Sequence, residues 1–239
     1  MLVGVDVDRC VFFYSVFQLH SHISNQKFPS QLYTTGLIRS IKQIMEQQND
    51  TRSQILTTGR RLTAQQGYTG VGLSSLLKEA GVPKGSFYHY FASKEAYGCA
   101  LLNEFMTEYG NRLNASLAHP DMDARSRVFT YFERWRTKQL SPIPEDRCLV
   151  VKLSAEVADL SADMSNILEK VVSDVVTHLA RTLEQGADDG TIVSLEDPRA
   201  SAEMLYHMWL GASLVASISH SDGPLNSAMD ATRALLPAP

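Results

Sequence analysis

Residues 72–95 read GLSSLLKEAGVPKGSFYHYFASKE, and this stretch predicts two short helices joined by a tight turn. Gly81 can adopt the left-handed backbone conformation that turns the chain between them. Pro83 stands where the second helix can begin, because its fixed φ and missing N–H are tolerated at a helix start. The first helix is indicated by apolar residues at the i, i+3, i+4 and i+7 spacing, namely Leu73, Leu76, Leu77 and Ala80.

The second helix of this pair, residues 84–91, is barely two turns long. A helix, a three-residue turn containing glycine and a second helix together make a helix-turn-helix. A further apolar helical face precedes the pair and ends at Gln66-Gly67. It is formed by Ile55, Leu56, Gly59 and Leu62. The sequence therefore predicts a three-helix head.

Long amphipathic helices are expected after the head. Ser93 is placed to cap the first of them, and Gly186 and Gly190 are expected to end the fourth. No alternating strand pattern of useful length and no internal repeat occurs, so the predicted fold class is all-α. The expected helices cover residues 94–113, 125–140, 148–160, 167–183, 205–219 and 225–236.

The composition is that of an ordinary globular protein. The 239 residues are 44% hydrophobic and 20% charged, which excludes disordered and low-complexity classes. The net charge of −4 divides unevenly, with +1 on residues 1–49, +3 on residues 50–97 and −8 on residues 98–239. A basic helix-turn-helix segment on an acidic chain suits a small DNA-reading head carried by a body that does not touch DNA.

The three cysteines, Cys10, Cys99 and Cys148, include no C-x-x-C pair, so neither a disulfide framework nor a zinc site is indicated. We expect no cofactor and no metal, and a reducing cytoplasm fits best. The apolar run at residues 10–17 is too short to span a membrane and follows acidic residues, so we expect no membrane association and no export.

Three segments divide the chain. Residues 1–44 differ in character from the rest, and we interpret them as an over-extended start or a weakly ordered appendage, the alternative being a helix packed on the body. Residues 49–109 are expected to form the helix-turn-helix domain. Residues 110–239 are expected to form an α-helical sensing and dimerisation domain.

The stretch 72–95 strongly resembles the DNA-binding head of TetR-family transcriptional regulators. The resemblance implies a homodimer that binds double-stranded operator DNA, with one three-helix head per subunit. It also implies an all-α body that binds ligand and dimerises. Within the body, we expect the dimer surface on the helices near residues 202–219 and 225–236, where small residues permit close helix approach.

Candidate DNA contacts begin at the N-terminal end of the second helix, which would face base edges in the major groove. Lys84 can reach guanine, Gly85 lets the backbone approach closely, and Ser86 adds a small polar group. Ser74 is placed to contact phosphate from the preceding helix. The resemblance adds three further contacts, Tyr88, His89 and Lys94.

Other aromatic residues in the stretch are expected to serve packing. Phe87 and Phe91 lie i, i+4 apart and are expected in the core of the head, while Tyr90 is left open. Pro83 departs from the Ser or Thr that many family members carry at that cap. The first N–H groups of the second helix must then find other acceptors.

Residues 147–157, RCLVVKLSAEV, predict a sensor thiol. Cys148 is expected in the first turn of a helix, where the dipole favours a thiolate, and Arg147 and Lys152 would add positive charge. We therefore predict that the pKa of the Cys148 thiol is lowered and that the thiol is reactive. The negative charges of Glu145 and Asp146 would oppose this lowering.

The head and this segment together resemble the TetR-family members that respond to electrophiles and reactive chlorine. That resemblance implies that modification of Cys148 by a thiol-reactive electrophile or oxidant releases DNA. The alternative is that Cys148 is a small packed hydrophobe.

The alternatives to a repressor triggered by a reactive cysteine are a repressor induced by a non-covalent ligand and a thiol-based oxidoreductase. A small-molecule inducer could bind without reacting, with Tyr206 and Trp209 as weak candidates for its pocket, although buried core is the preferred interpretation for both. Arg134-Trp135-Arg136 could coordinate an anion, and a solvated face is preferred there. An enzyme is not expected, because no catalytic motif occurs, and a thiol oxidoreductase based on Cys148 would lack a neighbouring resolving cysteine.

Overall fold

The computed structural model describes residues 50–238, which fall within one compact unit. The interpretation of residues 1–44, together with Cys10, lies outside the described residues. Every regular element in the described part is helical, so the all-α prediction is confirmed. A helix at residues 50–66 is followed by α3 (Leu73–Glu79), α4 (Lys84–Tyr90), α5 (Lys94–Leu117), α6 (Ala124–Gln139), the 3-10 helix η1 (Pro144–Asp146), α7 (Leu149–Ala158), α8 (Ala162–Asp188), α9 (Pro198–Ser219) and α10 (Gly223–Leu235).

The head follows the predicted turns. Gly67 has φ +79° after the first described helix, and Gly81 has φ +66° between α3 and α4, so both take the left-handed conformation that glycine tolerates. Phe87 is fully buried and packs on Phe91 and Tyr97, with ring centroids 5.3 and 5.7 Å away. The expected core role of Phe87 and Phe91 is confirmed.

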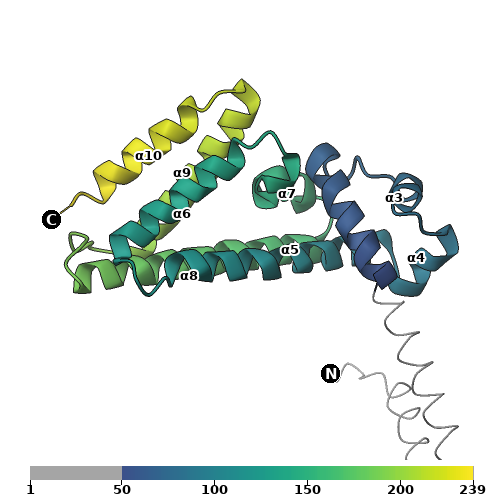
Figure 1. Ribbon diagram of the computed structural model, residues 1–239, viewed down its shortest axis with the longest axis horizontal. Coiled ribbons are helices and arrows are strands. Elements are labelled where there is room, and N and C mark those ends of the chain that lie inside the picture. Colours follow the sequence, from purple (N-terminus) through teal and green to yellow (C-terminus); the bar gives the residue numbers. More distant parts are fainter. Residues whose placement is uncertain (1–49, 239) are drawn as a thin grey trace, which may run out of the picture. The chain divides into compact units, whose positions relative to one another are not determined.

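The body is built around α5 and α8, which pack along each other (Figure 1). Helix α6 contacts both, and α9 packs between α8 and α10. Trp209 of α9 stacks on Phe132 of α6 at 4.8 Å, and its indole N–H donates to Thr232 of α10 at 3.0 Å. This cluster ties three helices together in the core.

Side-chain caps stabilise the N-terminal ends of most of the long helices. Ser93 accepts from the backbone N–H of Ala96 at 3.0 Å and so caps α5 as predicted. Asp123, Ser161 and Asp197 cap α6, α8 and α9 in the same way.

One predicted helix end is wrong. Gly186 lies inside α8 and is buried, and the helix runs on to Asp188 before Gly190 turns the chain with φ +72°. The reason is tertiary, because a Cβ on Gly186 would lie 2.5 Å from the side chain of Ile192. This glycine makes room for the returning chain instead of ending the helix.

Candidate functional site

The start of α4 presents the predicted base-reading residues to solvent. Lys84 and Gly85 are exposed, and Ser86 is half-buried. A Cβ on Gly85 would meet no atom within 4 Å, so packing within the chain does not require glycine there. An alanine would favour the helix by about 1 kcal/mol. Neither packing nor helix propensity therefore explains the glycine at this position.

The remaining predicted DNA contacts fall into two groups. Ser74 and His89 are exposed, and Tyr88 is 59% exposed with its ring edge against Phe87. Lys94 is half-buried, its Nζ 5.1 Å from the ring centroid of Tyr68. Because that ammonium also faces Tyr68, Lys94 combines its predicted phosphate contact with a role in the head.

Pro83 leaves the start of α4 without a side-chain cap. No side chain in the described part accepts a hydrogen bond from the first N–H groups of this helix, and α3, which follows Gly72, is the same. With Pro83 in place of a capping Ser or Thr, the start of α4 therefore has no side-chain acceptor. The N–H of Ser86 donates to the carbonyl oxygen of Pro83 at 2.9 Å, and the N–H groups of Lys84 and Gly85 remain available to solvent or phosphate.

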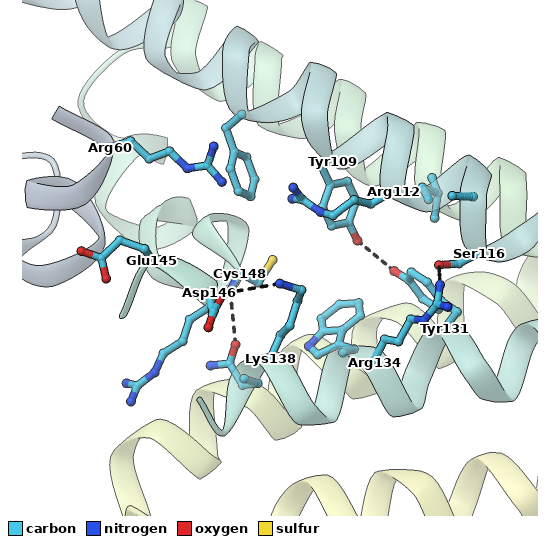
Figure 2. Close-up of a pocket in the computed structure, with 16 residues that line it drawn as sticks. Arg60, Tyr109, Arg112, Ser116, Tyr131, Arg134, Lys138, Glu145, Asp146 and Cys148 are labelled. Carbon is cyan, nitrogen blue, oxygen red and sulfur yellow. Dashed lines mark hydrogen bonds and ion pairs between the residues drawn. The ribbon is translucent and has the colours of Figure 1, made fainter. Parts of the chain in front are cut away.

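A cavity of about 420 Å³ opens between α5, α6 and the segment that leads into α7 (Figure 2). Arg60 from the helix at residues 50–66 also reaches it, so the head contributes directly to its wall. The lining is aromatic and cationic. It comprises Arg60, Phe105, Tyr109, Arg112, Leu113, Ala115, Ser116, Tyr131, Arg134, Trp135, Lys138, Gln139, Glu145, Asp146, Arg147 and Cys148.

Cys148 lines this cavity as the N-cap residue of α7, just ahead of the first turn in which it was expected. Burial raises the pKa of its thiol, and this outweighs the N–H groups of Val151 and Val150 and the charge of Arg112, which lower it. The predicted lowering of the pKa is therefore wrong. The helix terminus does favour the thiolate, but desolvation dominates.

The predicted cationic partners of Cys148 serve other groups. Arg147 lines the cavity, but its Nε and Nη2 donate to the carbonyl oxygen of Ser141 at 3.1 and 3.0 Å. Lys152 is exposed and lowers the pKa of Glu156. The charge of Arg112, from α5, lowers the pKa of the Cys148 thiol instead.

A pair of tyrosines in the cavity was not predicted. Tyr109 of α5 and Tyr131 of α6 share a hydrogen bond of 2.9 Å between their hydroxyls, and burial raises the pKa of both. Each is an ordinary apolar position of an amphipathic helix in the sequence. Only the contact between α5 and α6 makes them a polar pair in an aromatic wall.

Tyr206 and Trp209 do not line this cavity. Both are fully buried, Trp209 between Phe132 and Thr232 and Tyr206 behind Trp135, so the core interpretation holds for them. The run 134–136 divides in a similar way. Arg134 and Trp135 line the cavity, whereas Arg136 points to Glu133 and Asn226.

Glu156, two turns along α7 from Cys148, holds the end of the first head helix. Its carboxylate accepts from the backbone N–H of Tyr68 at 3.1 Å and from the backbone N–H and hydroxyl of Thr69. Gly67 makes this approach possible, because a Cβ there would lie 2.7 Å from Oε2 of Glu156. We call this set of contacts the Glu156 clamp.

Further contacts join the head to the body on either side of the clamp. Arg60 pairs with Glu108 of α5, and Gln65 donates to Glu145 at 3.2 Å. The Glu156 clamp is the contact that places an α7 side chain on the loop leading into α3.

Two family models match the chain. The model of bacterial regulatory proteins of the tetR family matches residues 55–96, and the tetracyclin repressor-like C-terminal domain matches residues 124–232. The HTH-type transcriptional repressor NemR of Escherichia coli strain K12 is 41% identical over 192 residues, which is 80% of this chain and 96% of NemR. The chain belongs to the TetR family.

Other similar proteins agree with this assignment. The crystal structure of E. coli NemR in its reduced form has a TM-score of 0.75 and 42% identity, covering 80% of this chain and 98% of that one. The HTH-type transcriptional repressor DhaR of Mycobacterium sp. strain GP1 is 27% identical over 188 residues, covering 78% of this chain and 93% of DhaR. TetR-family proteins are DNA-binding transcriptional regulators, so the expectation of a regulator that is not an enzyme is confirmed.

The described part of this TetR-family chain has neither a membrane-spanning helix nor a cluster of metal ligands. No helix within residues 50–238 is long and apolar enough to cross a membrane. In the same residues, no group of three or more His, Cys, Asp and Glu side chains is arranged to hold a metal ion.

The Glu156 clamp predicts a pH-dependent contribution to stability. Burial raises the pKa of Glu156. Hydrogen bonds from Thr69 and Tyr68 and the charge of Lys152 together lower it by more than burial raises it, so the net pKa is below the ordinary value. A depressed folded-state pKa gives stability that is complete above the unfolded value of about 4.3 and is lost as the pH falls through the folded value. Glu156→Gln should therefore lower the free energy of unfolding at pH 7 by about 1 kcal/mol, and this deficit should shrink as the pH falls below about 4.

Urea unfolding at a series of pH values measures this difference. Glu169→Gln, at an exposed position on α8, is the matched control and should show no such pH-dependent deficit. A Glu156→Gln deficit that is absent at pH 7, or that stays constant on acidification, contradicts the clamp.

Proposed function

We propose that this chain is a homodimeric repressor that leaves double-stranded operator DNA when a thiol-reactive electrophile or oxidant modifies Cys148. The observation that carries the proposal is the position of Cys148 and Glu156 on one short helix. The thiol begins α7 in a cavity, and the carboxylate further along α7 holds the head. The protein acts in the cytoplasm, where thiols are kept reduced.

DNA binding is assigned to the exposed start of α4. Lys84 and Ser86 supply donors for base edges and phosphates, and Gly85 supplies close backbone approach. Ser74, Tyr88, His89 and Lys94 add contacts around them. The excess of basic residues in 50–97 provides the electrostatic attraction, and the acidic body, with −8, stays away from the duplex.

Release is assigned to a movement of α7. Cys148 and Glu156 are eight residues apart, so about 12 Å of rigid helix separates them. An added group on the sulfur has to be accommodated at the helix start, where the backbone N–H of Cys148 donates to Gln139 at 3.4 Å. Moving or rotating α7 withdraws the Glu156 carboxylate from Tyr68 and Thr69, and the head loses the geometry that matches the DNA.

The relatives support this direction of control. NemR and DhaR are both named as repressors, and the similar NemR crystal structure is described as the reduced form. A protein with a named reduced form has an oxidisable group. In this chain, Cys148 is the cysteine that faces the cavity.

A second candidate is induction by a small molecule that binds the same cavity without reacting. The observation that favours it is the size and lining of the cavity, which would enclose a ligand of modest size between aromatic side chains. The two candidates share the site and the Glu156 clamp. They differ in whether a covalent bond to sulfur is needed.

Dimerisation is assigned to α9 and α10, within the sensing domain at residues 110–239. The apolar side chains Met204, Leu214, Val215 and Ile218 are all exposed on α9, and Ile218 is 72% exposed. Gly211 lies on the same face with open space around its Cα. An exposed apolar stripe with a small residue at its centre suits close packing against the same helix of a second copy.

Ile218→Glu should therefore convert the dimer to a monomer, because a charge would be buried in the helix pair. Light scattering after size exclusion gives the mass. The matched control is Val193→Glu, at another exposed apolar residue outside α9 and α10, which should stay dimeric. An Ile218→Glu protein that remains dimeric sinks this surface assignment.

Lys84→Ala should weaken specific DNA binding at least about fivefold, because a major-groove contact to guanine is worth about 1–3 kcal/mol. The measurement is a gel shift on a duplex taken from directly upstream of the chain's own coding sequence, at several salt concentrations. Lys170→Ala is the control, since this lysine is exposed on α8 and paired with Asp174. If the wild type forms no salt-sensitive complex with that duplex, the hypothesis that the protein regulates its own gene is contradicted. If Lys84→Ala binds the duplex as tightly as the wild type, the assigned contact of Lys84 is contradicted.

N-ethylmaleimide should release the wild-type protein from the same duplex with one adduct on Cys148, located by peptide mass spectrometry. Cys148→Ser should stay bound after the same treatment, whereas Cys99→Ser, a half-buried cysteine on α5, should be released like the wild type. Equal release of Cys148→Ser and wild type refutes the sensor assignment. Release by a non-reacting ligand in Cys148→Ser would favour the second candidate.

A further inference from the structure

The cavity beside Cys148 carries more positive than negative side chains. Its lining has five cations and two carboxylates, and most of the cations have partners. Arg60 and Arg112 share Glu108, and Lys138 lies 3.5 Å from Asp146. The five cations are Arg60, Arg112, Arg134, Lys138 and Arg147.

Arg134 differs from these partnered cations. Its Nη1 donates to the hydroxyl of Ser116 at 2.8 Å, which is a neutral partner, and no carboxylate in residues 50–238 forms an ion pair with it. Ser116 is buried and its hydroxyl fixes one nitrogen of the guanidinium, while the Arg134 residue as a whole is exposed. The remaining donors of this guanidinium form a planar fork suited to a carboxylate.

The cavity therefore has two chemically different sides. Figure 2 shows Cys148 toward one side, near Lys138 and Asp146, and Arg134 with Ser116 toward the other. Phe105 and the hydrogen-bonded pair Tyr109 and Tyr131 belong to the wall that connects these sides. A ligand spanning them needs an anionic group, a flat apolar middle and a group that meets sulfur.

The half-buried thiol of Cys148 gives such a ligand an advantage over simple reagents. Burial keeps the thiol largely protonated at neutral pH, because it raises the pKa, so random encounters with electrophiles react slowly. Holding the reagent next to the sulfur raises its effective concentration and offsets this loss. Arg134, with a neutral partner, can hold an anion while Arg112 stays with Glu108 and acts on Cys148.

We propose that the cavity selects electrophiles that carry a carboxylate, with Arg134 as the anion-binding residue and Cys148 as the nucleophile. The inducer class is thus a small, flat organic acid with an activated double bond, and this rests on the proposed sensing role of Cys148. In the reaction, sulfur forms a bond to one alkene carbon, the S–H bond breaks, and the thiol proton ends on the neighbouring carbon. No outside oxidant or reductant is consumed.

The test compares 3-maleimidopropionate with N-ethylmaleimide, which share one reactive ring and differ in the carboxylate. The rate of adduct formation on Cys148 is followed by mass spectrometry, and each rate is divided by the rate of the same reagent with glutathione. The wild type should favour the anionic reagent at least about tenfold, as expected for a charge-assisted guanidinium contact. Arg134→Gln should lose this preference, so that its normalised rates with the two reagents become equal.

Arg136→Gln is the matched control, because Arg136 lies two residues along α6 and bonds to Glu133 and Asn226 outside the cavity. It should keep the full preference. A second measurement uses the unreactive analogue 3-succinimidopropionate, which should bind Cys148→Ser and be detected by tryptophan fluorescence, since Trp135 lines the cavity. N-ethylsuccinimide should bind more weakly.

The outcomes separate the two proposals. A normalised rate ratio near one in the wild type, or a preference that survives in Arg134→Gln, overturns the anion site even if both maleimides release DNA. A preference that depends on Arg134 without any DNA release supports the anion site and overturns the sensing role instead.

Discussion

In the proposed mechanism, the contact between the carboxylate of Glu156 and the backbone of Tyr68 and Thr69 carries the signal from α7 to the head. It joins α7 to the loop that leads into α3, and it requires Gly67 to have no side chain. Hydrogen bonds to a charged group contribute about 1.5–3 kcal/mol, which is the size of typical couplings between two sites. In that mechanism, one carboxylate is enough to couple modification of Cys148 to the geometry of the helix-turn-helix.

The environment of Cys148 sets opposing effects against each other. The N–H groups at the start of α7 and the charge of Arg112 favour the thiolate, while burial between α5 and α6 disfavours it more strongly and raises the pKa. A protonated thiol reacts slowly with oxidants and alkylating reagents. In the proposed mechanism, selectivity comes from the cavity around the thiol, through its aromatic wall and through Arg134, whose partner is the neutral hydroxyl of Ser116.

Most of the fold was predictable because its signals are local. The spacing of Leu73 and Leu76, the positive φ of Gly81 and the cap of Ser93 each depend on a few neighbouring residues, and the structure agrees with all of them. The end of α8 was mispredicted because Gly186 faces Ile192, which returns from beyond the helix. A glycine that makes room for a packed side chain looks, in sequence, like a glycine that ends a helix.

The sequence by itself determined the helix-turn-helix, the exposed start of α4 and the place of Cys148 at a helix start, since these follow from periodicity, turns and caps. The tertiary structure alone decided which charges act on the thiol. In the folded chain, the charge of Lys152 acts on Glu156, Arg147 donates to the carbonyl oxygen of Ser141, and Arg112 of α5 acts on the thiol. It also brought Tyr109 to Tyr131 and left Arg134 with a neutral partner. The physical reason is that electrostatic and desolvation effects depend on distance and burial in space, which packing between distant segments sets.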